Sequence, residues 1–376
     1  MNLDDLRNLP TPAPTGFEPG IHWDGESGHV TVATAGEEPD RSKIDGVLKT
    51  SPFLDSDEIC VDWSARPRVS IHHDDAGNLV QAWYKLALKR RTGALADVRA
   101  LRDLMDTFHH PGPETAAPKW RTIQISDTHI GKGKTAGAGT DVLIERWKES
   151  ITGALDCGPV EGVHLAFLGD LIEGEVSNGG RNVTENDLFL QDQINIAAEL
   201  TAWTIDQALK VGYRVVVSAI PGNHGDISRQ FTRPMRDSHD VGIVASVQRE
   251  FRRDPANERI TWYYPEEDSG HLTYKVGDTI FTAAHGHMFK GKIKGAEDWW
   301  SGMTVNGRDP GAAHILMAGH FHSMSVTNFT RDKWIMFSPA LETQSTWWAE
   351  KTGGTSLHGM LAYDTIGGQP FNIGVH

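Results

Sequence analysis

The segment WRTIQISDTHIGKGK, residues 120–134, joins a short apolar run to a loop of acidic, imidazole and basic side chains. Apolar residues alternate from Trp120 to Ile125 and β-branched residues are frequent there, so the run predicts a strand. Asp127 and His129 follow directly after it. Side chains two positions apart in an extended chain point to the same side. The segment therefore predicts a strand that delivers an acid and a base to one place.

Four later strand-like runs also end in residues of the types that bind metal ions. The runs and their terminal residues are HLAFLGD with Asp170 and, three residues on, Glu173; RVVVSAIPGNHGD with Asn223, His224 and Asp226; TIFTAAHGH with His285 and His287; and HILMAGHFH with His320 and His322. Each motif alone is more often a turn or a surface histidine. Because loops at the carboxyl ends of strands in an open α/β sheet share one edge, the ordered recurrence predicts a single cluster.

The alternation of strand-like and helix-like runs after residue 118 predicts a layered α/β domain over residues 119–376. Its helices are expected over about 141–155, 188–211 and 239–252. Residues 21–110 are predicted to form a small α+β module, which contains a hairpin of RVSIHH and LVQAWYKL and a helix over 94–108. By composition, residues 1–20 are expected to be an extended arm and residues 111–118 a linker.

Composition predicts a soluble globular protein in a reducing compartment. The 376 residues are 39% hydrophobic and include only two cysteines, which disfavours thiolate zinc sites. The sequence has no signal-peptide pattern, and no apolar run reaches the roughly 18 residues that span a bilayer. We therefore expect a cytoplasmic location, in the host cytoplasm if a phage encodes the chain, and no membrane partner. The net charge of −14 disfavours a general polyanion binder, although it does not describe any single face.

The ordered motifs D-x-H, G-D-x-x-E, G-N-H, H-G-H and G-H-x-H, over about residues 123–322, resemble the calcineurin-like metallophosphoesterase superfamily. The resemblance implies a four-layer αββα sandwich of two mixed β-sheets flanked by helices, with a two-metal centre at the sheet edge. It implies that one metal is held by Asp127, His129 and His322, that the second is held by Asn223, His285 and His320, and that Asp170 bridges both. His224 matches the catalytic histidine that binds no metal.

One position departs from the pattern of this superfamily. The acid that usually follows the histidine of G-N-H is replaced by Gly225, and Asp226 comes one residue later. This leaves open whether Glu173 or Asp226 orients His224, so both acids join His224 as candidate catalytic residues. His287 is expected near the site without an assigned metal.

The implied chemistry accounts for these residue types. Two divalent ions about 3.5–4 Å apart can hold a bridging hydroxide as the nucleophile and clamp the phosphoryl oxygens. Asp170 would supply the anionic ligand that such a close pair of cations requires. His224, with an ordinary pKa of about 6.5, is then expected to protonate the leaving oxygen as the general acid. Nitrogen and oxygen ligands without sulfur fit Mn²⁺, Fe or Zn²⁺ and do not distinguish among them. Mn²⁺ is the metal that we expect first, with Fe, Zn²⁺, Ni and Mg²⁺ left open.

Basic loops follow three of the ligand motifs and bear on the substrate. The candidate substrate-binding residues are Lys132, Lys134, Arg229, Arg233, Lys290 and Lys292. Lysine and arginine position the phosphates of nucleic acids, and the neighbouring Trp299 and Trp300 could stack bases. The first hypothesis is a nuclease acting on DNA, similar to phage and bacterial members grouped with DNA-repair exonucleases.

The sequence leaves the substrate class, the presence of catalysis and the oligomeric state open. The alternative to the nuclease is hydrolysis of a small ester, namely a cyclic nucleotide, a dinucleotide or a phosphomonoester. A third hypothesis is a non-catalytic scaffold that keeps the fold as an interaction surface. A homodimer is also left open, because no segment identifies an interface.

Overall fold

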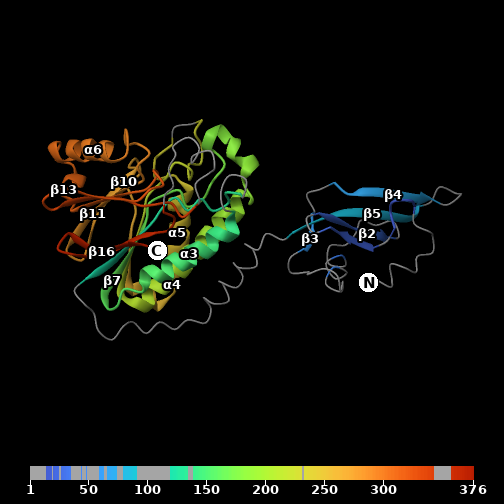
Figure 1. Cartoon of the computed structure of the whole chain (residues 1–376), viewed down its shortest axis with the longest axis horizontal. Coiled ribbons are helices and arrows are strands. Elements are labelled where there is room, and N and C mark those ends of the chain that lie inside the picture. Colours follow the sequence, from blue (N-terminus) through green and yellow to red (C-terminus); the bar gives the residue numbers. More distant parts are fainter. Residues whose placement is uncertain are drawn as a thin grey trace. The chain divides into compact units, whose positions relative to one another are not determined.

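The computed structural model describes residues 14–18, 20–24, 27–34, 44, 48, 59–62, 66–73, 79–90, 119–133, 139–230, 233–342 and 357–376. The chain divides into two compact units, residues 1–93 and 94–376, and each is described by itself (Figure 1). Residues 1–13 of the predicted arm, the helix over 94–108, the linker over 111–118 and Lys134 lie outside the described residues. None of the helices in the described ranges has the length and apolar character of a membrane span.

The first unit is built on one antiparallel sheet. Its strands are β1 (Gly20–Trp23), β2 (Gly28–Thr34), β3 (Ile59–Val61), β4 (Arg68–His73) and β5 (Leu79–Arg90). The long strand β5 pairs with β2, β3 and β4, and β1 pairs with β2. The predicted hairpin of RVSIHH and LVQAWYKL is present as β4 and β5. Alternate residues such as Val30, Val32, Leu86 and Leu88 are buried on one face of this sheet.

Two mixed sheets form the centre of the second unit. The first sheet has the order β16-β15-β6-β7-β8-β9, with β6 (Trp120–Ile125), β7 (Val160–Phe167), β8 (Gly212–Ala219), β9 (Ile260–Tyr263), β15 (Leu361–Ile366) and β16 (Gln369–Val375). Strands β6 to β9 run parallel, whereas β15 is antiparallel to β6. The second sheet has the order β10-β11-β12-β14-β13, with β10 (His271–Val276), β11 (Thr279–Ala284), β12 (Ile315–Ala318), β13 (Ser325–Thr330) and β14 (Lys333–Phe337).

Helices cover both outer faces of this pair of sheets (Figure 1). Helices α3 (Thr140–Leu155), α4 (Leu190–Val211) and α5 (His239–Phe251) share one apolar core with the first sheet. Helix α6 (Ile293–Val305) packs on the second sheet through Ala296 and Trp300. A third core, which includes Trp120 and Phe281, joins the two sheets. The predicted αββα layering is confirmed.

Short 3₁₀ segments and two missed strands complete the unit. The 3₁₀ segments are η1 (Ser177–Glu185), η2 (Pro255–Arg259) and η3 (Asp309–Ala312). The predicted helices begin within two residues of α3, α4 and α5.

Strands β13 and β16 were not predicted, and α6 begins inside the segment interpreted as a basic loop. Its only buried positions among residues 293–305 are Gly295, Ala296 and Trp300, too few to produce a clear helical repeat in the sequence.

Candidate metal centre

The predicted motifs meet where β6, β7, β8, β11 and β12 end at one edge of the two sheets. Main-chain hydrogen bonds join the first two loops, because the N–H groups of Thr128 and His129 both donate to the carbonyl of Asp170, at 2.9 and 3.1 Å. The N–H of His224 donates to the Asp170 carboxylate at 2.7 Å. The loop after β12 joins through the N–H of His320, which donates to Asp127 Oδ2 at 2.8 Å.

Two motif glycines are required because these loops approach one another closely. A Cβ atom at Gly222 would lie 2.2 Å from Asp170 Oδ1, and a Cβ atom at Gly319 would lie 2.4 Å from Asp127 Oδ2. Either side chain would displace a carboxylate of the cluster. The glycines of G-N-H and G-H-x-H therefore make room for the acids of the neighbouring motifs.

The candidate ligands lie at backbone positions with strained, positive φ angles. Five of the six non-glycine residues with positive φ in the described ranges belong to the cluster: Asp127, His129, Asp170, His320 and His322, with φ between 48° and 68°. Side chains other than glycine are uncommon in this left-handed region, and such conformations cost on the order of 1 kcal/mol or more each. The surrounding hydrogen bonds hold them there, which is typical of functional sites.

One group of ligand atoms consists of Asp127, His129 and His322. Asp127 Oδ1 lies 3.2 Å from His322 Nε2, and the Nε2 atoms of the two histidines are 3.4 Å apart. Asp127 Oδ2 accepts a hydrogen bond from Ser126 Oγ at 2.6 Å, whereas the buried Oδ1 faces the His322 imidazole and has no other hydrogen-bond donor. A buried carboxylate oxygen beside imidazole nitrogens fits a divalent cation.

A second group consists of Asp170, His285 and His320. His285 Nε2 lies 3.0 Å from Asp170 Oδ2 and 3.2 Å from Asn223 Oδ1, so the predicted Asn223 is present at the same place. His285 Nδ1 lies 2.7 Å from the carbonyl of Leu168. A histidine that donates from Nδ1 to a carbonyl offers Nε2 as a ligand, which is the usual arrangement in metal sites.

The structure distinguishes between the two acids considered for orienting His224. His224 Nδ1 lies 3.3 Å from Glu173 Oε2 and 3.1 Å from the Glu173 carbonyl. The same Oε2 lies 2.9 Å from His129 Nδ1. The side chain of Asp226 is instead 42% exposed and pairs with Arg229 Nε at 3.4 Å. Glu173 therefore orients His224, and the alternative with Asp226 does not fit this structure.

Electrostatic effects at the cluster are large because the groups are buried. Burial lowers the pKa of His285, but the neighbouring Asp170 outweighs it and raises this pKa to about 9. In the same way Asp127 and Glu342 overcome burial and raise the pKa of His322 to about 10. Burial raises the pKa of Asp127, yet the charge of His322 brings it well below its usual range. Cation binding at these imidazoles must therefore displace protons at neutral pH.

His287 and His320 show the opposite behaviour. Burial, reinforced by the charge of His285, lowers the pKa of each to about 4. The ring centroid of His287 lies 5.5 Å from that of His285 and 6.1 Å from that of His320. The expected position of His287 beside the cluster is therefore observed.

Two buried acids of the site were not predicted. Glu342 Oε1 lies 3.1 Å from His322 Nδ1, and Glu342 also forms an ion pair with Lys132. Asp240, in the first turn of α5, accepts hydrogen bonds from the main chain of the loops after β7 and β8. Glu342 follows the run FSPAL and Asp240 lies on a helix, so neither stands in a recognisable ligand spacing.

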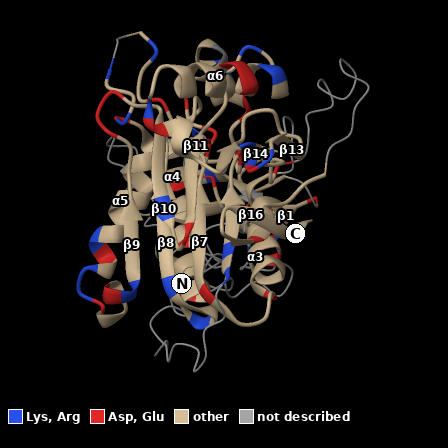
Figure 2. Ribbon diagram, turned by 90° about the vertical axis from the view of Figure 1, so that its left-hand side faces the viewer, with Lys and Arg blue, Asp and Glu red and all other residues tan. Residues whose placement is uncertain are grey.

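The predicted substrate-binding side chains are mostly engaged by the protein. Lys132 is paired with Glu342, Arg233 Nε donates to Asp237 at 2.6 Å, and Lys292 Nζ donates to Ser323 at 2.7 Å. Two others, Arg229 and Lys290, are exposed. Lysine and arginine are interspersed with aspartate and glutamate around α6 (Figure 2). The basic loops thus present fewer unpaired charges than their sequences suggest.

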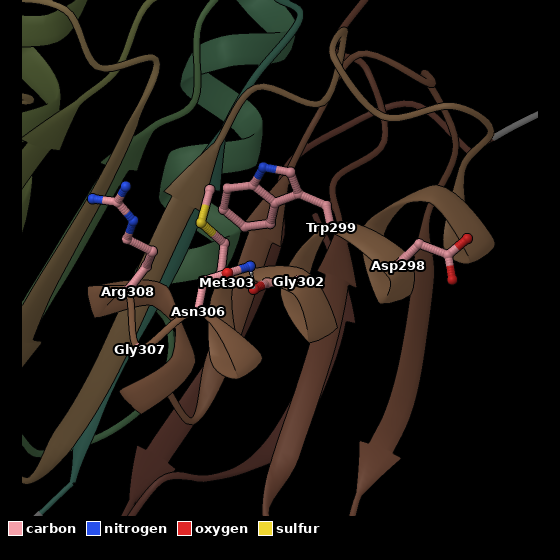
Figure 3. A pocket seen from close by; sticks show the side chains of 7 residues that line it. All are labelled: Asp298, Trp299, Gly302, Met303, Asn306, Gly307 and Arg308. Carbon is pink, nitrogen blue, oxygen red and sulfur yellow. Dashed lines mark hydrogen bonds between the residues drawn. The ribbon is translucent and has the colours of Figure 1, made fainter.

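The suggested tryptophan pair separates into a core residue and a surface residue. Trp300 is fully buried and its Nε1 donates to the Pro310 carbonyl at 2.6 Å, so the expectation that it stacks on a base is wrong. Trp299 is half-buried and lines a hollow of about 600 Å³. In this hollow it lies beside Met303, with Arg308 on the far side (Figure 3).

Comparison with known proteins gives only distant similarities. No family model matches the sequence, and no curated protein matches it. Among solved structures, a dimetal phosphatase from Danio rerio is similar with 11% identity and a TM-score of 0.33, over 65% of this chain and 92% of that one. Vps29 from Chaetomium thermophilum is similar with 10% identity and a TM-score of 0.32, over 66% and 82%. Vps29 from Entamoeba histolytica complexed with Zn²⁺ has 11% identity and a TM-score of 0.31, over 65% and 84%. At these scores the similarity carries no conclusion about activity.

Proposed function

We propose that the chain is a metal-dependent phosphoesterase that uses two divalent cations at the edge of its two sheets. The observation that carries this proposal is the position of Asp170, which belongs to one group of ligand atoms with His285 and His320 and to another with His129 and His224. Bound cations of this kind act as Lewis acids toward a phosphoryl group and toward water. Asp127, His129 and His322 would hold one cation and Asn223, His285 and His320 the other, with Asp170 between them.

His224 is the residue that we assign to proton donation. Its Nδ1 faces the carboxylate and the carbonyl of Glu173, which leaves Nε2 as the nitrogen that can deliver a proton. Burial lowers the pKa of His224, but Asp170 and Glu173 outweigh it and raise this pKa to about 9, which favours the imidazolium form that a general acid requires. As hydroxide attacks phosphorus and the ester P–O bond breaks, the proton passes from Nε2 to the leaving oxygen, which departs as a hydroxyl group.

DNA is the substrate that we propose for this centre. The guanidinium of Arg229 donates to the carbonyl of Asn223 at 2.5 Å, so an exposed cation is anchored to a candidate ligand residue. Arg229 and Arg233 also line a hollow of about 260 Å³ in the loop that follows His224. Together with the exposed Lys290, these side chains could position successive phosphates of a polymer.

A small phosphate ester is the second candidate, and the pairing of the basic side chains favours it. Lys132 faces Glu342 and Arg233 faces Asp237, so these two cations are already neutralised by the protein. A substrate with one phosphate needs only the metal centre and His224. The two candidates therefore differ in what the loops contribute and agree on the chemistry.

Degradation of end-labelled single- and double-stranded DNA in the presence of Mn²⁺ tests the proposal. A cyclic nucleotide and a nitrophenyl phosphodiester are assayed alongside, and Asp170→Asn serves as the blank. We expect the unaltered chain to cleave DNA and the variant to be inactive with less bound metal. Cleavage of the small esters alone would replace DNA by the second candidate. Full activity of Asp170→Asn with its metal retained would contradict the two-metal assignment.

A further inference from the structure

A buried carboxylate behind the metal centre connects two of its loops. Asp240 is 1% exposed and lies in the first turn of α5. Its Oδ1 accepts a hydrogen bond from the N–H of Leu171 at 2.9 Å. Its Oδ2 accepts from the N–H groups of Gly222 and Asp170, at 2.8 and 3.2 Å. One carboxylate thus holds the main chain of the G-D loop after β7 and of the G-N-H loop after β8.

The same carboxylate explains why glycine follows His224. A Cβ atom at Gly225 would lie 2.2 Å from Asp240 Oδ2 and 2.5 Å from its Cγ. Gly225 is not among the residues with positive φ, so its backbone would accept any side chain. Glycine is therefore needed at position 225 for space and not for conformation. The carboxylate of Asp240 fills the volume that a side chain at position 225 would enter.

We propose that Asp240 is a positioning residue of the metal centre and replaces the acid expected directly after His224. The carboxylate reaches the site from α5, fifteen residues further along the chain. Three N–H groups converge on it, and the first turn of a helix favours negative charge. By holding the N–H of Asp170, it supports the left-handed backbone from which the shared carboxylate faces both ligand groups.

If Asp240 positions the metal centre, an aspartate at position 225 should be able to replace it. In the double variant Asp240→Gly with Gly225→Asp, the Asp240 side chain is removed. A carboxylate on residue 225 can then enter the volume that the Asp240 carboxylate occupied. A residue that only stabilised α5 could not be replaced in this way, because position 225 does not belong to the helix. Rescue by the relocated acid is therefore the readout that separates positioning of the centre from stability of the helix.

The experiment compares five variants with the unaltered chain: Asp240→Asn, Asp240→Gly, Gly225→Asp, the relocated double variant, and Glu250→Gln as an exposed acid on the same helix. Mn²⁺ affinity is measured by titration calorimetry, and kcat and KM are measured on a nitrophenyl phosphodiester. We expect Asp240→Asn and Asp240→Gly to lose about 10- to 100-fold in Mn²⁺ affinity and kcat, with KM little changed. Gly225→Asp alone should also lose both, because two carboxylates would compete for one place. The double variant should recover most of the loss, and Glu250→Gln should match the unaltered chain.

Each outcome bears on the proposal. Equal Mn²⁺ affinity in Asp240→Asn and the unaltered chain would overturn the role of Asp240, as would a double variant no better than Asp240→Gly. Failure of both Asp240→Asn and the double variant to fold would also overturn it, because the acid would then serve the fold. The kinetic readout depends on the proposed function, whereas the Mn²⁺ titration does not. Metal binding without hydrolysis by the unaltered chain would therefore contradict the phosphoesterase proposal alone.

Discussion

Four imidazoles of the site, those of His129, His224, His285 and His322, are each oriented by an oxygen atom that faces Nδ1. Nδ1 faces the Leu168 carbonyl in His285 and the carboxylate of Glu342 in His322. Glu173 does the same for His129 and His224. In all four rings Nε2 is consequently the nitrogen left for a cation or a substrate. Such acceptors fix both the tautomer and the direction of a histidine, and their removal commonly weakens metal binding.

Replacement of His224 separates proton donation from metal binding. Since we assign proton donation to His224 and cation binding to other residues, His224→Ala should retain its bound metal. Its rate should fall by about 10²- to 10⁴-fold on esters with poor leaving groups and much less on nitrophenyl esters, which leave without a proton. Metal content and kcat on the two ester classes are measured together, with the exposed His358→Ala as the control. Equal losses on both classes would remove His224 as the general acid.

The candidate ligands could be predicted from the sequence because each ends an apolar run that folds as a strand. The acids that hold them could not. Glu342 reaches His322 from a loop after β14, and Asp240 reaches the G-D and G-N-H loops from a helix. Their relation to the site is set by packing between distant segments, which no spacing along the chain records. The sequence does show that Gly225 replaces the usual acid after His224. Only the structure shows the reason, which is that the Asp240 carboxylate fills the space beside Gly225.

At the scale of elements, the first sheet is joined across β6 and β15 by a buried ionic cluster. Asp364 on β15 is 1% exposed, and its carboxylate lies 3.3 Å from Arg121 Nη1 on β6 and 2.9 Å from Lys119 Nζ. Asn372 on β16 donates to the same carboxylate at 2.9 Å. The cluster lies at the β6 end remote from Asp127, so it serves the fold and not the centre.

Removal of the acid from this cluster should destabilise the domain without altering its chemistry. Asp364→Ala leaves a buried guanidinium without its partner, and breaking a buried pair in this way costs about 3–5 kcal/mol. The free energy of unfolding is measured in denaturant on the metal-free chain, and Mn²⁺ affinity is measured at a temperature at which the variant is folded. The exposed Asp332→Ala is the matched control. An unchanged unfolding midpoint would show that the cluster contributes little.

The predicted and observed elements differ where the sequence pattern is weakest. Helices α3, α4 and α5 bury a full apolar face against the first sheet, so their periodicity is clear in the sequence. Helix α6 buries few residues on the outside of the second sheet, and its lysines and glycines indicated a loop. Four of the six residues of strand β13 are polar, and Asn328 and Thr330 are exposed, so its sequence lacks the apolar alternation that predicts a strand.

At the scale of the whole molecule, the division into residues 1–93 and 94–376 places every candidate ligand in one unit. A chain shortened to residues 94–376 should therefore fold, bind metal and hydrolyse a nitrophenyl phosphodiester with kcat and KM unchanged. Its activity on DNA is measured in parallel with that of the full chain. A selective loss on DNA would assign the first unit to substrate binding. Loss of metal binding would show that the second unit does not carry a complete site.

The pairing of β6 with β15 also has a consequence during synthesis. Arg121 and Asp364 are 243 positions apart, yet their strands are neighbours in the first sheet. While the ribosome is still making the residues between them, one edge of β6 has no neighbour, and an open strand edge can pair with other chains. Until residues 361–366 emerge, the nascent protein therefore exposes the strand that leads to Asp127, so this is the stage at which a chaperone would have most effect.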